Sequence, residues 1–254
     1  MINIITSYPK SGNTWLRFIL FNILFNIDDK KFSSKDIEKL VPDFHKIIKD
    51  NSKLILDENL INKKIFIKTH HDYLKVKSLN IDKVILILRN PLDVLASIIN
   101  YYDIKKESLD FVVEEFSKHH NLTIFKTKYN FPSYSEHIKS WTDSGKDLLI
   151  INYSELIDNF EETVKNLSKF INENIDEKKI KLIKEKTNFS NLLNLEKFER
   201  ENKIHGFFTT SISNQNNFMN KGKNKNYENL FNQSQIKKLE DSFCEIIQKY
   251  NLNL

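Results

Sequence analysis

Residues 6–16 read Thr-Ser-Tyr-Pro-Lys-Ser-Gly-Asn-Thr-Trp-Leu and directly follow the apolar run Ile2–Ile5. This order predicts a short strand, a tight turn that contains Gly12, and the start of a helix. Backbone N–H groups at such a turn converge on one point, and a helix start favours negative charge there. Lys10 adds a mobile cation at the same place. The segment is therefore predicted to bind an anion.

The loop resembles the phosphosulfate-binding loop of sulfotransferases that use 3′-phosphoadenylyl sulfate (PAPS). The family motif reads Tyr-Pro-Lys-Ser-Gly-Thr-Thr-Trp, and only Asn13 departs from it. Asparagine keeps a hydrogen-bonding group at the turn and is a good helix starter. A P-loop NTPase would need Gly-x-x-x-x-Gly-Lys followed by Ser or Thr. This chain lacks both the first Gly and the Gly-Lys order.

A second group of polar residues, Lys68-Thr69-His70-His71, follows the apolar residues Ile65 to Ile67. Ligands of open α/β sheets gather at the carboxyl ends of the strands, where these side chains would emerge. The resemblance implies that His70 is a general base and that Lys68 stabilises the sulfuryl group during transfer. An ordinary imidazole pKa of about 6.5 leaves much of a histidine neutral at physiological pH. His71 receives no role, and the alternative that both histidines merely end a strand stays open.

Arg89 is the third candidate, because it directly precedes a well-marked helix start. Capping alone explains Asn90, Pro91 and Asp93. It does not explain a cation beside a helix N-terminus, which is unfavourable unless an anion lies there. Only three of the 39 basic residues are arginines, which suggests that a planar guanidinium is needed at this position. The resemblance implies that Arg89, with Ser97 eight residues later, holds the ribose 3′-phosphate of PAPS.

Weaker matches cover the rest of the implied cofactor site. Trp15 offers a flat face to a base, Tyr153 takes the place of a family tyrosine, and Thr187-Asn188-Phe189 resembles a Thr-Ser-Phe segment that packs on adenine. Residues 218–223 resemble the family's Phe-Met-Arg-Lys-Gly lid. The cofactor-binding residues implied by the resemblance are Lys10, Ser11, Gly12, Asn13, Thr14, Trp15, Arg89, Ser97, Tyr153, Thr187, Phe189, Phe218, Asn220, Lys221 and Gly222.

Two departures from the family motifs concern the lid and the oligomeric state. Asn220 replaces the lid arginine, so we expect a weaker or differently closed lid, with Lys223 or Lys225 as partial substitutes. A basic disordered loop is the alternative for this segment. The family dimer motif is replaced by Asn232-Gln233, which leaves monomer and homodimer both open.

The order of apolar and helical patterns predicts the fold. Short β-branched runs typical of buried strands are Ile2–Ile5, Ile65–Lys68, Val84–Leu88 and Leu148–Asn152. Helical patterns are Thr14–Phe25, Lys35–Lys49, Leu92–Tyr101, Leu109–Phe125, Tyr134–Thr142, Glu155–Ile171, Glu177–Lys186, Asn191–Glu199 and Gln233–Tyr250. Strands that alternate with helices imply a parallel sheet. We predict one α/β, three-layer, P-loop-like domain over residues 1–254, with a central parallel sheet of four or five strands flanked by helices.

Composition limits the function classes. The net charge of +5 and pI near 8.9 are mild, and the basic residues are spread along the chain, which favours a solvated surface over a nucleic-acid site. No stretch approaches the roughly 20 apolar residues of a membrane span. The N-terminus also lacks a signal peptide, so we expect a cytoplasmic protein. The single cysteine, Cys244, excludes an intrachain disulfide. No residue cluster has metal-ligand spacing, so no metal is expected.

The function predicted from the resemblance is transfer of the sulfuryl group from PAPS to a hydroxyl or amine of a small-molecule acceptor. The nucleotide product is adenosine 3′,5′-bisphosphate (PAP). The assigned catalytic residues are Lys10, His70 and Lys68. Two alternatives stay open: a nucleoside or small-molecule kinase with a divergent phosphate loop, which would need Mg²⁺, and a non-catalytic nucleotide-binding protein. The sequence does not identify the acceptor, although the segments 103–107, 130–133 and 201–217 are expected to face it.

Overall fold

The computed structural model describes residues 2–25, 33–49, 64–204, 206–208, 218–219 and 222–252. A parallel four-stranded sheet lies at its centre, with the strands in the order β2-β1-β3-β4. The strands are β1 (Ile2–Ser7), β2 (Ile65–Thr69), β3 (Ile81–Leu88) and β4 (Asp147–Asn152). Their near-continuous apolar sequence is that of strands covered on both faces. The predicted parallel α/β architecture is therefore confirmed.

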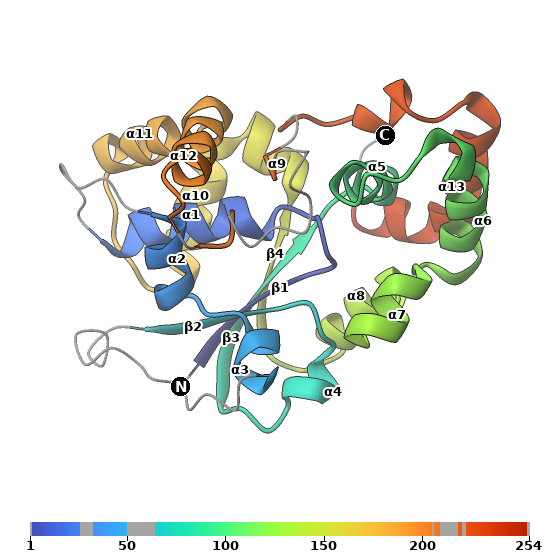
Figure 1. Ribbon diagram of the computed structural model, residues 1–254. Coiled ribbons are helices and arrows are strands. Elements are labelled where there is room, and N and C mark those ends of the chain that lie inside the picture. The colour runs from blue at the N-terminus through green and yellow to red at the C-terminus, as the bar shows by residue number, and fades with distance from the viewer. Residues whose placement is uncertain are drawn as a thin grey trace.

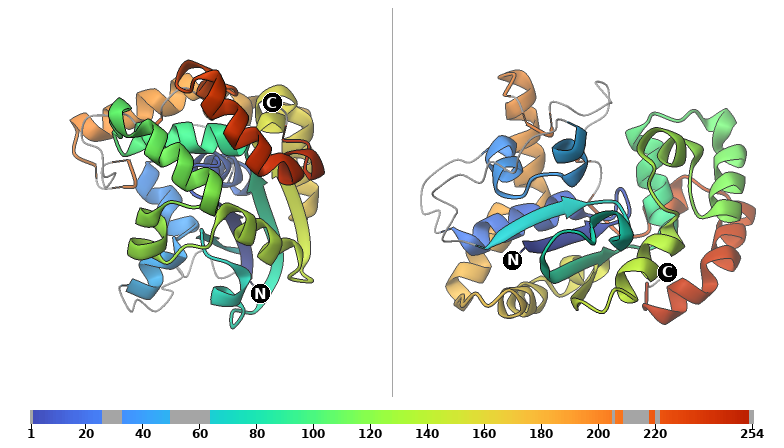
Figure 2. Two further views of the ribbon diagram at one scale, coloured as in Figure 1. Left: turned by 90° about the vertical axis from the view of Figure 1, so that its right-hand side faces the viewer. Right: turned by 90° about the horizontal axis from the view of Figure 1, so that it is seen from below.

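Helices cover both faces of this sheet, as Figures 1 and 2 show. One face packs against α1, α9 (Tyr153–Asp158), α10 and α11 through a core that includes Leu16, Leu156, Val164 and Ile183. The other face packs against α5, α6, α8 and α13. The helices of eight or more residues are α1 (Asn13–Leu24), α5 (Pro91–Tyr101), α6 (Leu109–His119), α8 (Tyr134–Thr142), α10 (Phe160–Phe170), α11 (Glu177–Lys186), α12 (Phe189–Glu201) and α13 (Gln233–Lys249).

Three helices expected to be continuous are each broken into two. The predicted helix 35–49 is α2 (Ser34–Leu40) and α3 (Phe44–Lys49), because the carbonyl of Pro42 between them accepts the N–H of Lys68 on β2. The predicted helix 109–125 ends at α6, since His120 adopts φ 50°, and α7 (Thr123–Tyr129) follows. The predicted helix 155–171 is α9 (Tyr153–Asp158) and α10. A short helix, α4 (Tyr73–Val76), was not predicted.

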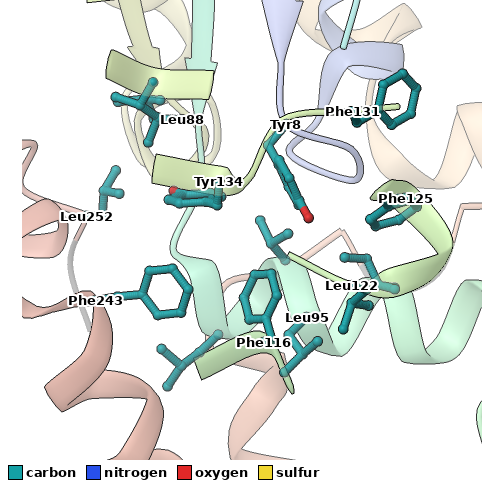
Figure 3. Close-up of a cluster of buried hydrophobic side chains, with 14 of the residues drawn as sticks. Tyr8, Leu88, Leu95, Phe116, Leu122, Phe125, Phe131, Tyr134, Phe243 and Leu252 are labelled. Carbon is teal, nitrogen blue, oxygen red and sulfur yellow. The ribbon is translucent and has the colours of Figure 1, made fainter. Parts of the chain in front are cut away.

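Two tyrosines anchor the loops at the carboxyl end of the sheet in the core (Figure 3). The Tyr8 ring, directly after β1, lies against Phe125 and Tyr134 at centroid distances of 5.9 and 5.4 Å, and its hydroxyl donates to Asn121 at 2.9 Å. The Tyr134 hydroxyl donates to the carbonyl of Arg89 at 2.6 Å. A buried hydroxyl needs such a partner, so each tyrosine fixes one loop by packing and by a hydrogen bond.

Candidate active site

Each strand of the sheet is followed by a residue that the sequence analysis assigned to the site. Lys10 follows β1, His70 follows β2, Arg89 follows β3 and Tyr153 follows β4. All four line one cavity of about 910 Å³. The other predicted site residues that line it are Gly12, Asn13, Thr14, Trp15, Lys68, Ser97, Phe189, Phe218 and Gly222.

Lys10 lies in the turn between β1 and α1 with a φ of 67°. Its Nζ is 4.0 Å from the centroid of the Tyr101 ring and 4.1 Å from that of Phe218. Aromatic faces attract a cation, but they replace few of the hydrogen bonds that water would offer. Burial, together with the charge of Arg89, accordingly lowers the pKa of Lys10 to about 7. The ammonium is therefore a poorly solvated group that an anionic ligand would stabilise.

The Arg89 guanidinium connects the loop after β1 to the C-terminal segment, which comprises residues 218–219 and 222–226. One terminal nitrogen donates to the carbonyl of Lys10 and the other to the carbonyl of Lys223, each at 3.2 Å. The guanidinium also stacks over the Tyr153 ring, 4.3 Å from its centroid. Arg89 Nε and the buried Ser11 Oγ have no hydrogen-bond partner among the described residues. Buried polar atoms are normally paired. Arg89 lines the cavity, so its Nε is suited to a bound ligand, whereas Ser11 is not among the lining residues.

Gly12 makes the turn possible, because its backbone and its surroundings both exclude a side chain. Its φ is 106°, and a Cβ placed on it would lie 2.5 Å from Cδ2 of Tyr153. The loop therefore lies directly on the tyrosine that supports Arg89. Gly222 is similar, since a Cβ there would lie 2.3 Å from Cδ2 of Phe189.

We expect Gly12→Ala to destabilise the protein by about 3 kcal/mol, the sum of left-handed backbone strain and overpacking against Tyr153. Gly145→Ala is the matched control, because Gly145 also has a positive φ, 68°, but has no atom within 4 Å of the added Cβ. That control should lose about 1 kcal/mol. Thermal unfolding of the two variants measures the difference. Equal melting temperatures would contradict the contact between the loop and Tyr153.

His70 is held in a defined tautomer. Its Nδ1 lies 2.7 Å from the carbonyl of Ser7, which can only accept, so Nδ1 carries the proton and Nε2 keeps a lone pair in the neutral ring. Burial and the nearby Lys68 ammonium hold the pKa of His70 well below its usual value of 6.5. The side chain is therefore neutral at pH 7 and able to accept a proton at Nε2.

Thr187 is a predicted cofactor-binding residue that is not among the residues lining the cavity. The Thr187 hydroxyl is buried and donates to the carbonyl of Ile183 at 2.7 Å, so it takes part in helix α11. The carbonyl of Thr187 accepts the indole N–H of Trp15 at 2.8 Å, which fixes that ring at the cavity wall. Asn220 and Lys221 lie outside the described residues.

Two buried carboxylates hold the segment that resembles the lid, and sequence reasoning missed both roles. Glu196 on α12 accepts the N–H groups of Phe218 and Met219 at 2.6 and 2.8 Å. Asp93 on α5 accepts the N–H groups of Lys225 and Asn226 at 2.9 and 2.7 Å. Glu196 follows the buried Leu192 by four residues, and a carboxylate on the apolar face of a helix was the available signal.

His71 has a structural environment. Its ring packs 5.0 Å from the Phe131 centroid, its N–H donates to Thr69 Oγ1, and its carbonyl accepts the Trp141 indole N–H. Burial and the neighbouring His45 lower the pKa of His71 to about 4. These contacts connect β2 to α8.

Aromatic rings gather around Phe131, a cavity-lining residue next to His70. The Phe131 ring lies edge-on to His70 at 5.6 Å and is stacked on Tyr129 at 5.3 Å. The segments predicted to face an acceptor contribute Asp103, Ile104, Lys106, Phe131 and Phe207 to the lining, and other aromatic members include Tyr101, Tyr102, Phe125 and Tyr129. Residues 209–217 of the third predicted segment lie outside the described residues.

The match to a known family extends over almost the whole chain. The sulfotransferase domain family matches residues 3–251. The chain belongs to the sulfotransferase family. It is 27% identical over 259 residues to sulfotransferase 1 family member D1 of Mus musculus, with 98% of this chain and 84% of that protein covered. It is 26% identical to the luciferin sulfotransferase of Photinus pyralis, with 94% and 69% covered.

Solved structures share the fold of this sulfotransferase. Mouse sulfotransferase SULT7A1, crystallised with PAP, aligns with a TM-score of 0.68 at 23% identity, covering 99% of this chain and 86% of that one. A retinol dehydratase in complex with androsterone and PAP aligns with a TM-score of 0.70 at 16% identity, covering 100% and 82%. Identities this low establish the shared fold alone.

Two features are absent from the described part of the sulfotransferase. None of its helices is both long enough and apolar enough to cross a bilayer. No group of three or more His, Cys, Asp or Glu side chains in the described ranges is placed to hold a metal ion.

Proposed function

We propose that this sulfotransferase takes the sulfuryl group from PAPS, and that His70, Lys10 and Lys68 carry out the transfer. PAPS supplies an activated sulfate ester. The acceptor oxygen forms a bond to sulfur as the bond from sulfur to the phosphate oxygen breaks, and the acceptor proton passes to Nε2 of His70. Lys10 lies on the turn that would hold the phosphosulfate and neutralises the leaving phosphate oxygen.

The arrangement around Arg89 is the observation that carries this proposal. The Arg89 guanidinium is bound to both the β1–α1 loop and the C-terminal segment, its Nε has no partner among the described residues, and its charge acts on the poorly solvated Lys10 ammonium. These groups together suit a ligand with two separate phosphate-type anions. PAPS has that pattern, in its phosphosulfate and its ribose 3′-phosphate. Family membership and the PAP bound to related folds support the same donor.

The remaining predicted cofactor contacts form the adenosine part of the proposed site. Trp15 lies at the cavity wall with one side stacked on Phe160, at 6.1 Å between centroids. Phe189 lies against Gly222, which brings the C-terminal segment next to the aromatic rings. We infer that the adenine lies between these aromatic residues and that Ser97 assists Arg89 at the 3′-phosphate.

For the acceptor, we infer a small hydroxyl compound with a flat or apolar body. The walls around Phe131 offer aromatic faces and edges, which bind apolar ring surfaces. One relative is named luciferin sulfotransferase, which indicates a small-molecule acceptor for that protein. Incubation with labelled PAPS and a panel of phenols, fatty alcohols, sugars and amines, followed by mass analysis, identifies the class that gains sulfate. The same incubation separates an enzyme from a non-catalytic nucleotide-binding protein.

The wider predictions concern domain count and location. We infer that residues 1–254 act as one sulfotransferase domain, since the family match spans 3–251 and α13 packs against α5 and α6. The cytoplasmic location stays a prediction, and monomer and homodimer both stay open.

Binding calorimetry of the wild-type protein with PAP and with adenosine 5′-phosphate tests the donor. We expect PAP to bind about thirtyfold more tightly, because a bidentate contact from Arg89 to the 3′-phosphate is worth roughly 2 kcal/mol. Arg89→Met should remove this preference. Arg89→Lys, which keeps a charge but not the fork, should retain only part of it. Equal affinity of the wild-type protein for the two nucleotides would contradict PAPS as donor.

A further inference from the structure

Asp43 is an acidic residue in the cavity wall to which neither the motifs nor the proposed reaction gives a role. It lies between α2 and α3, where the chain makes an isolated parallel bridge to Lys68 at the end of β2. The carbonyl of Pro42 accepts the Lys68 N–H at 2.9 Å in the same bridge. The backbone thus brings the Asp43 side chain to the strand that carries Lys68 and leads into His70.

Both oxygens of the Asp43 carboxylate are engaged. Oδ1 accepts the backbone N–H of His45 at 3.0 Å, and Oδ2 lies 2.6 Å from Nζ of Lys68. The Lys68 side chain is only 9% exposed and that of Asp43 only 21%, so the ion pair is largely removed from water. A carboxylate held at two points fixes the direction of the ammonium that it binds.

We propose that Asp43 is a positioning residue for sulfuryl transfer, which holds the Lys68 ammonium in the cavity wall and offsets its charge next to His70. This inference rests on the proposed roles of Lys68 and His70. A buried ion pair contributes little net stability compared with apolar residues, so stability alone gives a weak reason for its presence. Asp43 lies in the cavity wall and interacts with the proposed base, His70, and this location gives a functional reason for the ion pair.

The charges around the two groups support the proposal. Lys68 lowers the pKa of His70, whereas Asp43 raises it and so counteracts part of the effect. Burial opposes ionisation of Asp43, but the charges of Lys68 and His70 hold its pKa below the usual range. The titratable and charged groups that face Asp43 are Lys68, His70, Arg17 and His71, and those that face His70 are Lys68, Asp43 and His137.

The test compares turnover against pH for the wild-type protein and Asp43→Asn. We expect kcat to fall about tenfold at neutral pH, because a Lys68 charge that Asp43 no longer offsets makes His70 a weaker base. The acid limb of kcat/KM should move to lower pH by about one unit, the effect of one nearby charge on a pKa. Asp43→Glu, which keeps the charge, should restore the position of the acid limb.

Asp147→Asn is the matched control, since Asp147 also pairs with a strand lysine, Lys83, but lies outside the cavity lining. It should leave turnover and the acid limb unchanged. If Asp43→Asn transfers sulfuryl at the wild-type rate with the wild-type pH profile, Asp43 has no positioning role. PAP affinity should be the same in the wild-type protein and in Asp43→Asn. A wild-type protein that neither binds PAP nor transfers sulfuryl would contradict the proposed function instead.

A second pair of variants covers the case in which Asp43→Asn does not fold. The double variant Lys68→Met/Asp43→Asn removes both members of the ion pair. It is compared with Lys68→Met alone. The acid limb of the double variant should lie at lower pH, because only the single variant retains a carboxylate beside His70. Coincident limbs in these two proteins would overturn the proposal. Thermal unfolding confirms that the compared proteins are folded.

Discussion

Replacement of Lys10 by methionine is expected to reduce kcat by about a hundred- to a thousandfold, the usual cost of removing one group that stabilises developing charge. Its ammonium lies in the turn after β1 and is buried between the Tyr101 and Phe218 rings. The methionine keeps contact with the two rings, so the fold should persist. Sulfuryl transfer from saturating labelled PAPS measures the loss, and circular dichroism monitors the fold.

The pH dependence separates a charged role for Lys10 from a packing role. The pKa of Lys10 is about 7 in the free protein, and only the protonated form neutralises an oxyanion. The wild-type kcat/KM, which reports free-enzyme groups, should therefore fall as pH rises above about 7. This limb should be absent from Lys10→Met. Lys83→Met is the matched control, since the Lys83 Nζ also lies over an aromatic ring, that of Phe170 at 5.0 Å. A Lys10→Met protein as active as this control would refute the assigned role.

His70→Ala is expected to lower kcat by about a hundred- to ten-thousandfold, the range for loss of a general base. The Ser7 carbonyl fixes Nδ1 as the protonated nitrogen, so Nε2 is the atom that would take the acceptor proton in the proposed mechanism. The pKa of His70 is lowered well below its usual value, so lowering the pH from 8 to 6.5 should not protonate the proposed base. Activity should fall only at more acidic pH, as His70 becomes protonated. Initial rates between pH 5 and 8 measure this limb.

His71→Gln is the control for this change, because His71 is adjacent in sequence but packs against Phe131 and Trp141 instead of lining the cavity. We expect it to lower stability and leave the acid limb in place. PAP affinity should be close to wild type in His70→Ala, since the base acts on the acceptor. If His70→Ala turns over as fast as His71→Gln, another group removes the proton.

Local chemistry made the strands and the main loop predictable. The strands were predicted to within three residues at each end, because a continuous β-branched run has few alternatives to a strand buried on both faces. The turn at Gly12 was predictable because glycine tolerates the left-handed backbone that a close turn requires. Asn90 caps α5 as expected, with Oδ1 accepting the Leu92 N–H at 2.8 Å. Each of these depends on residues close together in the chain.

Helix breaks were less predictable, because tertiary contacts decide them. The apolar pattern of residues 35–49 is compatible with one helix until the Pro42 carbonyl finds its partner on β2. His120 takes a left-handed conformation where its ring stacks on Phe243 of α13, at 4.1 Å between centroids. Each partner, Lys68 on β2 or Phe243 on α13, lies outside the helix that is broken, so no local sequence pattern predicts the break.

The sequence by itself determined that a lysine-bearing loop, a histidine and an arginine follow successive parallel strands, because strand order and turn chemistry are encoded in neighbouring residues. Only the tertiary structure decided which partners hold the site together. Asp43 binds Lys68, and Glu196 and Asp93 bind backbone N–H groups of the C-terminal segment. Arg89 binds the carbonyls of Lys10 and Lys223. Most of these partners are far apart in the chain. A polar side chain can bind any of several distant groups, and the packing of helices on the sheet selects which of them it meets.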